Sequence, residues 1–180
     1  MEIRISRINM FKKFIHFVLL IGILIGCEKG LEPPETQDGG GYKPPYGIRG
    51  NIYFKNFISR DSVKGLFVAA SQESLLSKSQ IPSLILSGKI EYIDVTTSYG
   101  QDTIPYSLLF KTIPAGKIPY IAVVHQFGAT IAPENLQIVG LYYNDNDTTH
   151  PGFVIVPKDS IVSGIDIAVD FYNLPPQPPE

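Results

Sequence analysis

The residues whose types could support chemistry are two histidines, a run of Asp and Asn, and a pair of aspartates. His125 lies in an apolar segment and His150 lies beside Pro151, and neither has a second His or a Cys at metal-ligand spacing. Each histidine therefore fits a structural role better than catalysis or metal binding. The chain has one Cys, which excludes a zinc site built on paired cysteines and an intramolecular disulfide.

The run Asn144–Thr148 offers the oxygen ligands that calcium takes. An EF-hand loop also needs Glu at its twelfth position, and counting from Asp145 places Pro151 seventh and Val156 twelfth. Asn and Asp favour tight turns through their own side-chain hydrogen bonds. We therefore predict a hairpin connection here and no metal site.

Asp166 and Asp170 fall on one face of an alternating segment. Four residues of extended chain, at about 3.3 Å each, separate them by roughly 13 Å. Carboxylate pairs that act on one glycosidic bond lie about 5–9.5 Å apart. The spacing thus favours solvated charges that protect a sheet edge over a catalytic pair.

Other catalytic signatures are missing from the sequence. It has no Gly-x-Ser-x-Gly nucleophile elbow, and its glycine run Gly39–Gly41 is not followed by the Lys-Ser or Lys-Thr pair of a phosphate-binding loop. We predict that the chain is not an enzyme and uses no cofactor.

An apolar run near the amino terminus predicts an export signal. Phe14 to Ile25 is a nearly unbroken apolar stretch of 12 residues. A helix needs about 20 apolar residues to cross a bilayer, whereas the apolar region of a signal peptide needs about 7–15. The residues before the run include four basic ones, Arg4, Arg7, Lys12 and Lys13. Residues 1–26 are therefore predicted to be a cleaved signal peptide.

The end of this run, Leu24-Ile25-Gly26-Cys27, resembles the lipobox of bacterial lipoproteins. The resemblance implies cleavage after Gly26 and a diacylglycerol thioether on Cys27, with the protein anchored by lipid in the bacterial cell envelope, at the outer membrane or the periplasmic face. The alternative is an uncleaved anchor helix in which Cys27 is an ordinary residue. Both alternatives predict attachment to a membrane.

Composition and charge limit the partners. The chain of 180 residues is 44% hydrophobic and 18% charged, which fits a globular domain rather than a disordered tail. Without residues 1–26 it keeps 11 basic and 16 acidic residues, a net charge of -5. This charge disfavours nucleic acid and anionic lipid surfaces as partners.

Proline and glycine mark the boundaries of one domain. Residues 27–46 contain the predicted lipidated Cys27 and a Pro- and Gly-rich tether, which spans at most roughly 60 Å in polyproline geometry. Residues 174–180 form a Pro-rich tail that cannot continue a strand or helix. The folded domain is thus predicted over residues 47–173.

Within this domain, apolar residues recur with period two. Ile48, Ile52 and Phe54 alternate with polar neighbours, and so do Ile165, Ile167, Val169 and Phe171. Eight strands are predicted: 48–54, 66–70, 90–95, 104–113, 120–126, 136–143, 153–156 and 165–172. The fold class expected is all-β, an antiparallel β-sandwich of seven or eight strands. The segment Ser71–Leu86 fits either a short helix or a loop, and we interpret it as the connection between the two sheets.

Three segments resemble the carboxypeptidase regulatory-like, or transthyretin-like, sandwich domains of secreted bacterial proteins. They are the entry strand Ile48–Ile52, the strand-turn-strand region from Ile113 to Val123, and the closing segment Val162–Ile167. The resemblance implies a compact sandwich, transthyretin-like or Ig-like, that serves as a spacer or interaction module. It brings no catalytic residues to this chain.

The function expected is therefore that of a lipid-anchored envelope protein whose sandwich is a non-catalytic spacer or binding module. An alternative is a glycan- or protein-binding accessory subunit of an envelope enzyme or surface assembly, which a stripe of exposed tyrosines on one sheet would favour. A third is a structural subunit that pairs through long free strand edges. The tyrosines in or beside the predicted strands, which also suit the core, are Tyr92, Tyr99, Tyr106, Tyr120, Tyr142, Tyr143 and Tyr172.

Overall fold

The computed structural model describes residues 44–75, 77–144 and 147–179. Within these residues it contains ten strands, one α-helix and four 3-10 turns. The strands are β1 (Gly47–Lys55), β2 (Gly65–Ser71), β3 (Ile90–Asp94), β4 (Thr103–Leu109), β5 (Gly116–Ile118), β6 (Tyr120–Gln126), β7 (Leu136–Leu141), β8 (Val154–Val156), β9 (Ile161–Val162) and β10 (Ile167–Asp170). The helix is α2 (Ile81–Leu86), and the 3-10 turns are η1 (Arg60–Ser62), η2 (Lys78–Gln80), η3 (Thr96–Ser98) and η4 (Pro133–Asn135).

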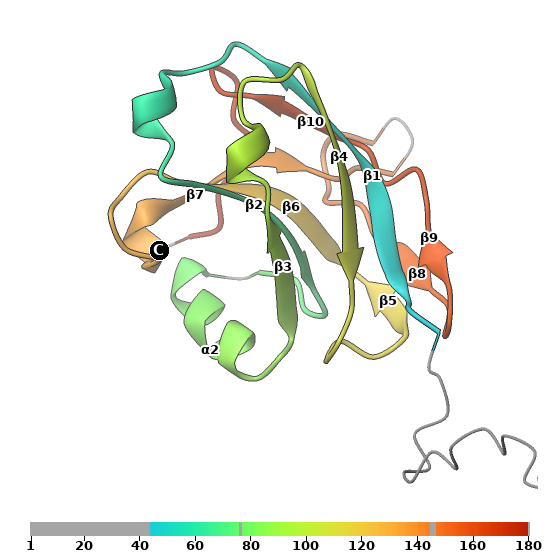
Figure 1. Cartoon of the computed structure of the whole chain (residues 1–180). Helices are drawn as coiled ribbons and strands as arrows, with labels where there is room; N and C mark the ends of the chain where they lie inside the picture. Colours follow the sequence, from blue (N-terminus) through green and yellow to red (C-terminus); the bar gives the residue numbers. More distant parts are fainter. Residues whose placement is uncertain (1–43, 76, 145–146, 180) are drawn as a thin grey trace, which may run out of the picture. The chain divides into compact units, whose positions relative to one another are not determined.

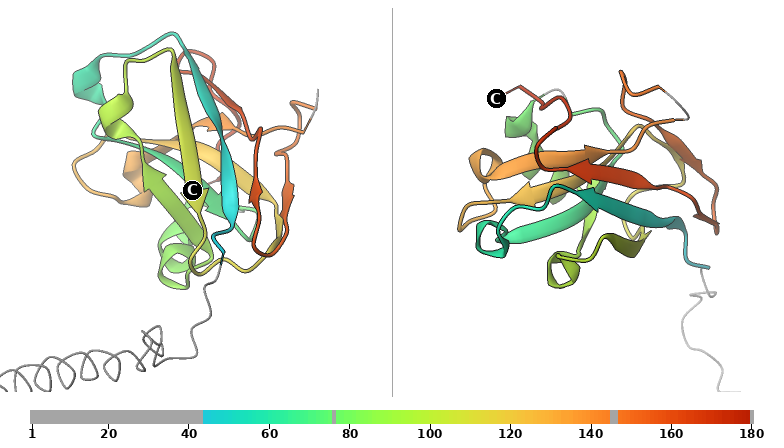
Figure 2. Two further views of the ribbon diagram at one scale, coloured as in Figure 1. Left: turned by 45° about the vertical axis from the view of Figure 1, so that its right-hand side comes forward. Right: turned by 90° about the horizontal axis from the view of Figure 1, so that it is seen from above.

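The strands form two four-stranded sheets and one small sheet (Figure 1). Sheet A has the order β10-β1-β4, with β9 also paired to β1. Sheet B has the order β3-β2-β6-β7, and sheet C consists of β5 and β8. In the right-hand view of Figure 2, β10 lies beside β1, its neighbour in sheet A.

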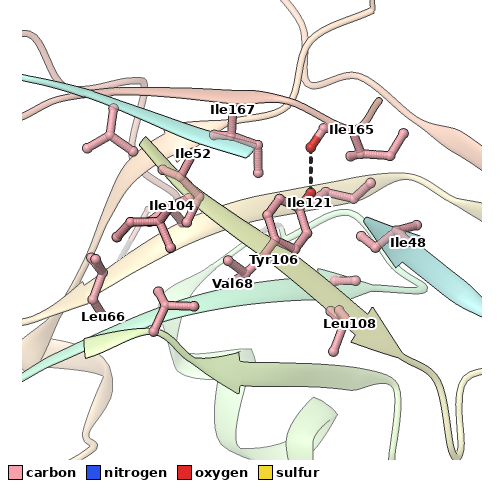
Figure 3. Close-up of a cluster of buried hydrophobic side chains, with 14 of the residues drawn as sticks. Ile48, Ile52, Leu66, Val68, Ile104, Tyr106, Leu108, Ile121, Ile165 and Ile167 are labelled. Atoms are coloured by element: carbon pink, nitrogen blue, oxygen red, sulfur yellow. Dashed lines mark hydrogen bonds between the residues drawn. The ribbon is translucent and has the colours of Figure 1, made fainter. Parts of the chain in front are cut away.

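A single hydrophobic core joins the two layers. Strands β1, β4 and β10 of sheet A and strands β2, β6 and β7 of sheet B all contribute buried side chains to it. Figure 3 shows these side chains pointing toward one another, with the Tyr106 hydroxyl donating a hydrogen bond to the Ile165 carbonyl at 2.6 Å. Two sheets that share one core define a β-sandwich, so the predicted fold class is confirmed.

The predicted alternation is confirmed in the first and last strands. Ile48, Ile52 and Phe54 are buried in β1, whereas Arg49 and Tyr53 between them are exposed. Around β10, Ile165, Ile167, Val169 and Phe171 are buried, and the side chains of Asp166, Ala168 and Tyr172 face solvent. Period two therefore identified the core face of both strands correctly.

Two details of the predicted sandwich are wrong. Strand β1 pairs in parallel with β10, Ile52 opposite Ile167, and in parallel with β9, so sheet A is mixed rather than antiparallel. The described residues form ten strands rather than seven or eight, because the sequence did not predict β5 and β9, which have only three and two residues. Such short strands carry no periodic signal, and pairing direction depends on the course of the connections rather than on the pattern within a strand.

Strand β4 ends at Leu109, earlier than the predicted Ile113. The backbone N–H groups of Lys111, Thr112 and Ile113 donate to the carboxylate of Glu91 instead of to a neighbouring strand. This carboxylate ties the end of sheet A to β3 of sheet B.

The segment Ser71–Leu86 does not connect the two sheets, which corrects our interpretation. It contains η2 and α2 and leads from β2 to β3, which are neighbours in sheet B. A capping box formed by Ser77 and Gln80 begins η2, and Pro82 lies in the first turn of α2, where its missing N–H costs nothing. In Figure 1 the helix lies beside β3.

The folded unit does not end near Asn173, as the sequence predicted, but includes the tail through Pro179. The tail forms no strand or helix, yet Leu174 packs against the core and Pro178 is buried. The Pro179 carbonyl accepts a hydrogen bond of 2.8 Å from the Lys78 backbone N–H. A proline-rich segment cannot extend a sheet, but its rings can still bury apolar surface against one.

Candidate functional site

The outer face of sheet B, which points away from the core, forms an apolar groove. Side chains from all four strands line it together with side chains of the segments that flank the sheet, and apolar atoms make up its wall surface. A sheet face exposed to water normally carries polar residues. The lining residues are Phe67, Ala69, Ala70, Ser71, Leu75, Lys78, Ile81, Ile85, Ile90, Tyr92, Tyr120, Ala122, Val124, Ile131, Leu136, Gln137, Ile138, Gln177 and Pro178.

Two alanines give the groove its depth. Ala69 of β2 lies directly opposite Ala122 of β6 in the ladder between the two central strands, and Tyr92 of β3 lies opposite Ala69 on the other side. Because alanine has only one side-chain carbon, the floor is low where these strands meet. The groove has a volume of about 70 Å³.

Three separate segments form the walls. Ile81 and Ile85 of α2 line one wall, Ile131 contributes from the loop before η4, and Pro178 contributes from the tail. Tyr120, Ala122 and Ile138, which line the groove, form with Leu141 a second, smaller apolar cluster outside the main core. The groove is therefore built on a sheet that is apolar on both faces.

Gln177 fixes the tail to the edge of sheet B. Its side-chain Oε1 accepts a hydrogen bond from the Ile138 N–H at 2.9 Å, and its Nε2 donates to the Ile138 carbonyl at 2.8 Å. The amide side chain thus pairs with β7 as a neighbouring strand would. Further along β7, Gly140 lies so close to β10 that an added Cβ would be 2.8 Å from the Ala168 carbonyl oxygen. The tail therefore covers the edge of β7 at Ile138, and β10 packs closely against Gly140.

Glu91 holds the β3 side of the groove. Burial raises the pKa of its carboxyl group, but hydrogen bonds from Thr112, Ile113 and Lys111 outweigh this effect and leave the pKa below its ordinary value. A carboxylate that accepts several backbone N–H bonds is stabilised in its charged form. Strand β3 is therefore fixed to residues 111–113 by a charged group.

The free edge of β4 carries a proline. Pro105 supplies no backbone N–H, and a proline within an edge strand hinders the addition of another strand. Pro105 on β4 and the hydrogen bonds of Gln177 to β7 both count against the expectation that a partner strand pairs with a long free edge.

His125 is buried at the end of the core, with 3% of its surface exposed. Its Nε2 lies 3.0 Å from the Ser62 carbonyl oxygen, and its ring meets Phe171 edge to face at 5.7 Å. Burial lowers the pKa of the imidazole and so favours its neutral form. No other His, Cys, Asp or Glu of the described residues joins it in a group suited to metal binding.

The hairpin predicted at Asn144–Thr148 is wrong, because β7 before this run pairs with β6 and β8 after it pairs with β5, so the run connects two different sheets. The described residues of this connection bond to one another. Asn144 accepts a hydrogen bond from the Phe153 N–H at 2.6 Å, and Thr149 donates to Asp147, which lowers the pKa of that carboxyl to about 2. His150 is exposed and its Nδ1 lies 3.3 Å from Asp147 Oδ2. Asp145 and Asn146 lie outside the described residues.

The aspartates of the last strand region bond to different residues of the first strand region. Asp166 Oδ1 accepts a hydrogen bond from the Asn51 backbone N–H at 2.8 Å, and Asp170 Oδ1 accepts one from Asn56 Nδ2 at 2.8 Å. Both carboxylates thus stabilise the junction between the start and the end of the domain, which is a role that the sequence did not predict.

The exposed tyrosines do not form one stripe. Tyr53 is 44% exposed on sheet A, Tyr92 is 45% exposed on sheet B, and Tyr172 is 76% exposed after β10. Tyr106 is buried in the core and Tyr120 in the smaller cluster, and burial raises the pKa of both hydroxyls. The tyrosine pattern expected of a glycan-binding face is therefore divided between the two sheets.

Cys27, the predicted signal peptide and most of the predicted tether lie outside the described residues. Among the residues that are described, no helix is long and apolar enough to cross a bilayer.

The groove was not predicted, although one strand carries a signal for it. The segment Tyr120–Val124 is apolar at every position, which is typical of a strand buried on both faces. The walls carry no comparable signal, because α2, the loop before η4 and the tail come from distant parts of the chain.

The fold and the groove thus define an all-β sandwich with one sheet covered on its outer side. Comparisons with protein-family models, with curated proteins and with solved structures returned no match.

Proposed function

We propose that the protein is a lipid-anchored lipoprotein of the bacterial cell envelope whose sandwich is a non-catalytic binding module. The observation that carries this proposal is the apolar groove on the outer face of sheet B. An exposed apolar groove with a few polar groups at its margin is typical of a ligand site, whereas a domain that acts only as a spacer has no need of one.

The predicted anchor supports the same function. Two or three acyl chains on Cys27 would hold the protein stably at a membrane, since each buried methylene contributes about 0.8 kcal/mol. The tether, with its Pro33-Pro34, Gly39–Gly41 and Pro44-Pro45, would let the domain move over the membrane surface. The groove would then be presented to ligands of the envelope.

The transthyretin-like resemblance is consistent with a binding module and is part of the proposal. A glycan-binding function has less support, because glycans need hydrogen-bonding groups that the walls of the groove do not offer. An exposed stripe of tyrosines on one sheet would have favoured it.

The anchor is tested by the intact mass of the protein recovered from membranes. We expect a chain that begins at residue 27 and carries diacylglycerol, and we expect Cys27→Ala to abolish both changes. Thr36→Ala, in the tether, is the control and should be processed normally. An unmodified chain that retains Met1 would contradict the anchor, and reproducible hydrolytic turnover by the purified protein would contradict the non-catalytic role.

A further inference from the structure

We infer that the end of the sandwich at which the chain enters the domain docks on an anionic lipid bilayer. This entry surface consists of Leu86, Leu109, Lys111, Lys117, Phe153, Ile155, Lys158 and Asp159. The inference rests on the proposed function only in placing the protein at a membrane. Its evidence is the point at which the chain enters the domain, the apolar side chains that this end exposes, and the charge of this end.

The chain enters the domain beside these residues. Pro44 is the first described residue and leads directly into β1. The Gly47 N–H donates a hydrogen bond to the Ser160 carbonyl at 3.0 Å, and Gly47 lies opposite Leu109 in the ladder between β1 and β4. Because the predicted tether is joined to Pro44, a lipid on Cys27 would keep this end of the domain closer to the bilayer, on average, than the far end of β1.

A hydrogen bond joins the end of α2 to the end of β4. Thr112, which follows β4, donates through its Oγ1 to the Gly88 carbonyl at 2.9 Å. Leu86 and Leu109, the last residues of α2 and β4, thus flank one contact. Figure 1 shows α2 and the start of β1 toward the same end of the domain.

Sheet C brings the other residues of the entry surface to the start of β1. Strand β5 follows β4 in the chain and pairs with β8, so that Lys117 lies opposite Ile155. After β8, the turn that contains Lys158 and Asp159 leads to β9, which pairs with Gly47. Sheet C and this turn therefore border the point at which the chain enters.

The entry surface exposes four large apolar side chains. Leu86 is 88% exposed, Ile155 is 63% exposed, and Leu109 and Phe153 are exposed as well. They project from a helix end, a strand end and sheet C, and none of them lines the groove on sheet B. The interfacial region of a bilayer accepts projecting apolar side chains without a matching shape, whereas a protein partner needs a complementary surface. A lipid surface therefore fits this end better than a protein does.

The charges of the entry surface suit anionic lipid. Lys111, Lys117 and Lys158 are exposed, and Asp159 is the one acidic residue of the eight. The Lys117 ammonium lies 4.3 Å from the centroid of the Phe153 ring, so this surface presents a charge and an apolar side chain together. Each lysine close to an anionic bilayer strengthens binding about fivefold.

The opposite end of the sandwich differs in charge. It also exposes large side chains, Phe127 and Tyr172. The charged residues around it have both signs, with aspartates in the majority: Asp61, Asp94, Asp102, Asp170, Lys55, Arg60 and Lys64. The net charge of -5 outside residues 1–26 disfavours anionic surfaces for the chain as a whole, but this charge is not spread evenly. An anionic bilayer should therefore favour the entry surface over the opposite end.

The test uses the full chain recovered from membranes and reconstituted into vesicles of equal parts phosphatidylcholine and phosphatidylglycerol. The vesicles also contain a phosphatidylcholine that carries a diazirine near the glycerol end of one acyl chain. After irradiation, mass spectrometry should locate the label on peptides that contain residues 109–117 and 153–158. Peptides that contain Phe127 or Tyr172 should carry at least about fivefold less label. Equal labelling of the two ends, or no label on residues 44–179, would overturn the inference.

Ile155→Asp places a negative charge on the entry surface and should lower the labelling of residues 153–158 several-fold. The matched control is Ile131→Asp, at an exposed position between β6 and β7, which should leave this labelling unchanged. Circular dichroism checks that each variant is folded. Should Ile155→Asp impair folding, Leu86→Ser, at the most exposed of the apolar positions, takes its place. Equal labelling of a folded entry-surface variant and of the control would overturn the inference.

The double substitution Lys111→Gln with Lys158→Gln tests the choice of anionic lipid. It should lower labelling of the entry surface at least about fivefold in the mixed vesicles. Lys55→Gln, at the far end of β1, is the control and should have no effect. Equally strong labelling of the wild type in vesicles of phosphatidylcholine alone would overturn the choice of an anionic bilayer. Labelling that changes with the number of protein copies per vesicle would indicate contact between copies, which also contradicts the inference.

The outcomes separate this inference from the proposed anchor. The intact mass of the same sample reports the diacylglycerol on Cys27, whereas the pattern of label reports which end of the domain meets the bilayer. An unmodified chain labelled on the entry surface would contradict the anchor and support docking. A lipidated chain without label on the entry surface would support the anchor and contradict docking.

Discussion

The outer faces of the two sheets differ although the sheets share one core. On sheet A the outward positions are polar or solvated, among them Arg49, Lys55 and Ser107. On sheet B the outward positions include Tyr120, Ala122 and Ile138, all buried. Sheet A therefore meets water directly, whereas sheet B needs α2, the loop before η4 and the tail to cover it. The difference shows that the outer face of sheet B, unlike that of sheet A, carries apolar side chains that lie beside α2, the loop before η4 and the tail.

The largest expected effect comes from placing a charge on each face. Ala122, which is 2% exposed, lies on the floor of the groove, and Ala168 lies exposed on sheet A. We expect Ala122→Asp to lower the free energy of unfolding by about 3 kcal/mol or more, because it buries a charge without a partner. Ala168→Asp should change it by less than about 0.5 kcal/mol. Denaturant unfolding measures both, and similar values would contradict the difference between the faces.

Glu91→Gln tests how the margin of sheet B is fixed. Because the partly exposed carboxylate accepts backbone hydrogen bonds from residues 111–113, we expect a loss of about 1–2 kcal/mol in the free energy of unfolding. Thermal or urea unfolding gives the value. Glu73→Gln, at an exposed ion pair with Lys89, is the control and should cost less than about 0.5 kcal/mol.

The Glu91 effect should also depend on pH. The folded pKa lies below the ordinary value of 4.5, so the stabilisation is complete above that pH and is lost as the pH falls through the folded pKa. The difference in unfolding free energy between wild type and Glu91→Gln should therefore shrink in acid. A difference that stays constant from pH 7 to pH 3 would refute the assignment.

Gln177→Ala tests the cover over β7. The substitution removes both hydrogen bonds to Ile138, and we expect it to lower the free energy of unfolding by about 1–2 kcal/mol. Hydrogen exchange should become faster at the Ile138 amide. Pro176→Ala, at an exposed position of the tail, should leave that amide protected.

The smallest effect comes from two tyrosines that are almost equally exposed. Tyr92 meets Phe67 edge to face with ring centroids 5.6 Å apart, and no ring pair in the described part of the chain includes Tyr53. We expect Tyr92→Ala to lower the free energy of unfolding by about 0.5–1.5 kcal/mol more than Tyr53→Ala does, because it also removes this aromatic contact. Equal costs in denaturant unfolding would mean that exposure alone sets the contribution of these side chains.

The site was less predictable than the fold. Period two located β1 and the last strand closely, because alternation records which face a strand buries. The floor of the groove had a weak signal in the apolar positions of β6. Its walls had none, because the fit of Ile81, Ile131 and Pro178 around one space depends on how distant segments pack.

The sequence by itself determined the all-β class and the core face of the first and last strands, since these depend on local pattern. The tertiary structure alone decided that β1 pairs in parallel with β10, that Ser71–Leu86 returns to the same sheet, and that Gln177 bonds to β7. Each of these features joins segments far apart in the chain. Their free energy comes from contacts that exist only once the two sheets have packed, so no local pattern records them.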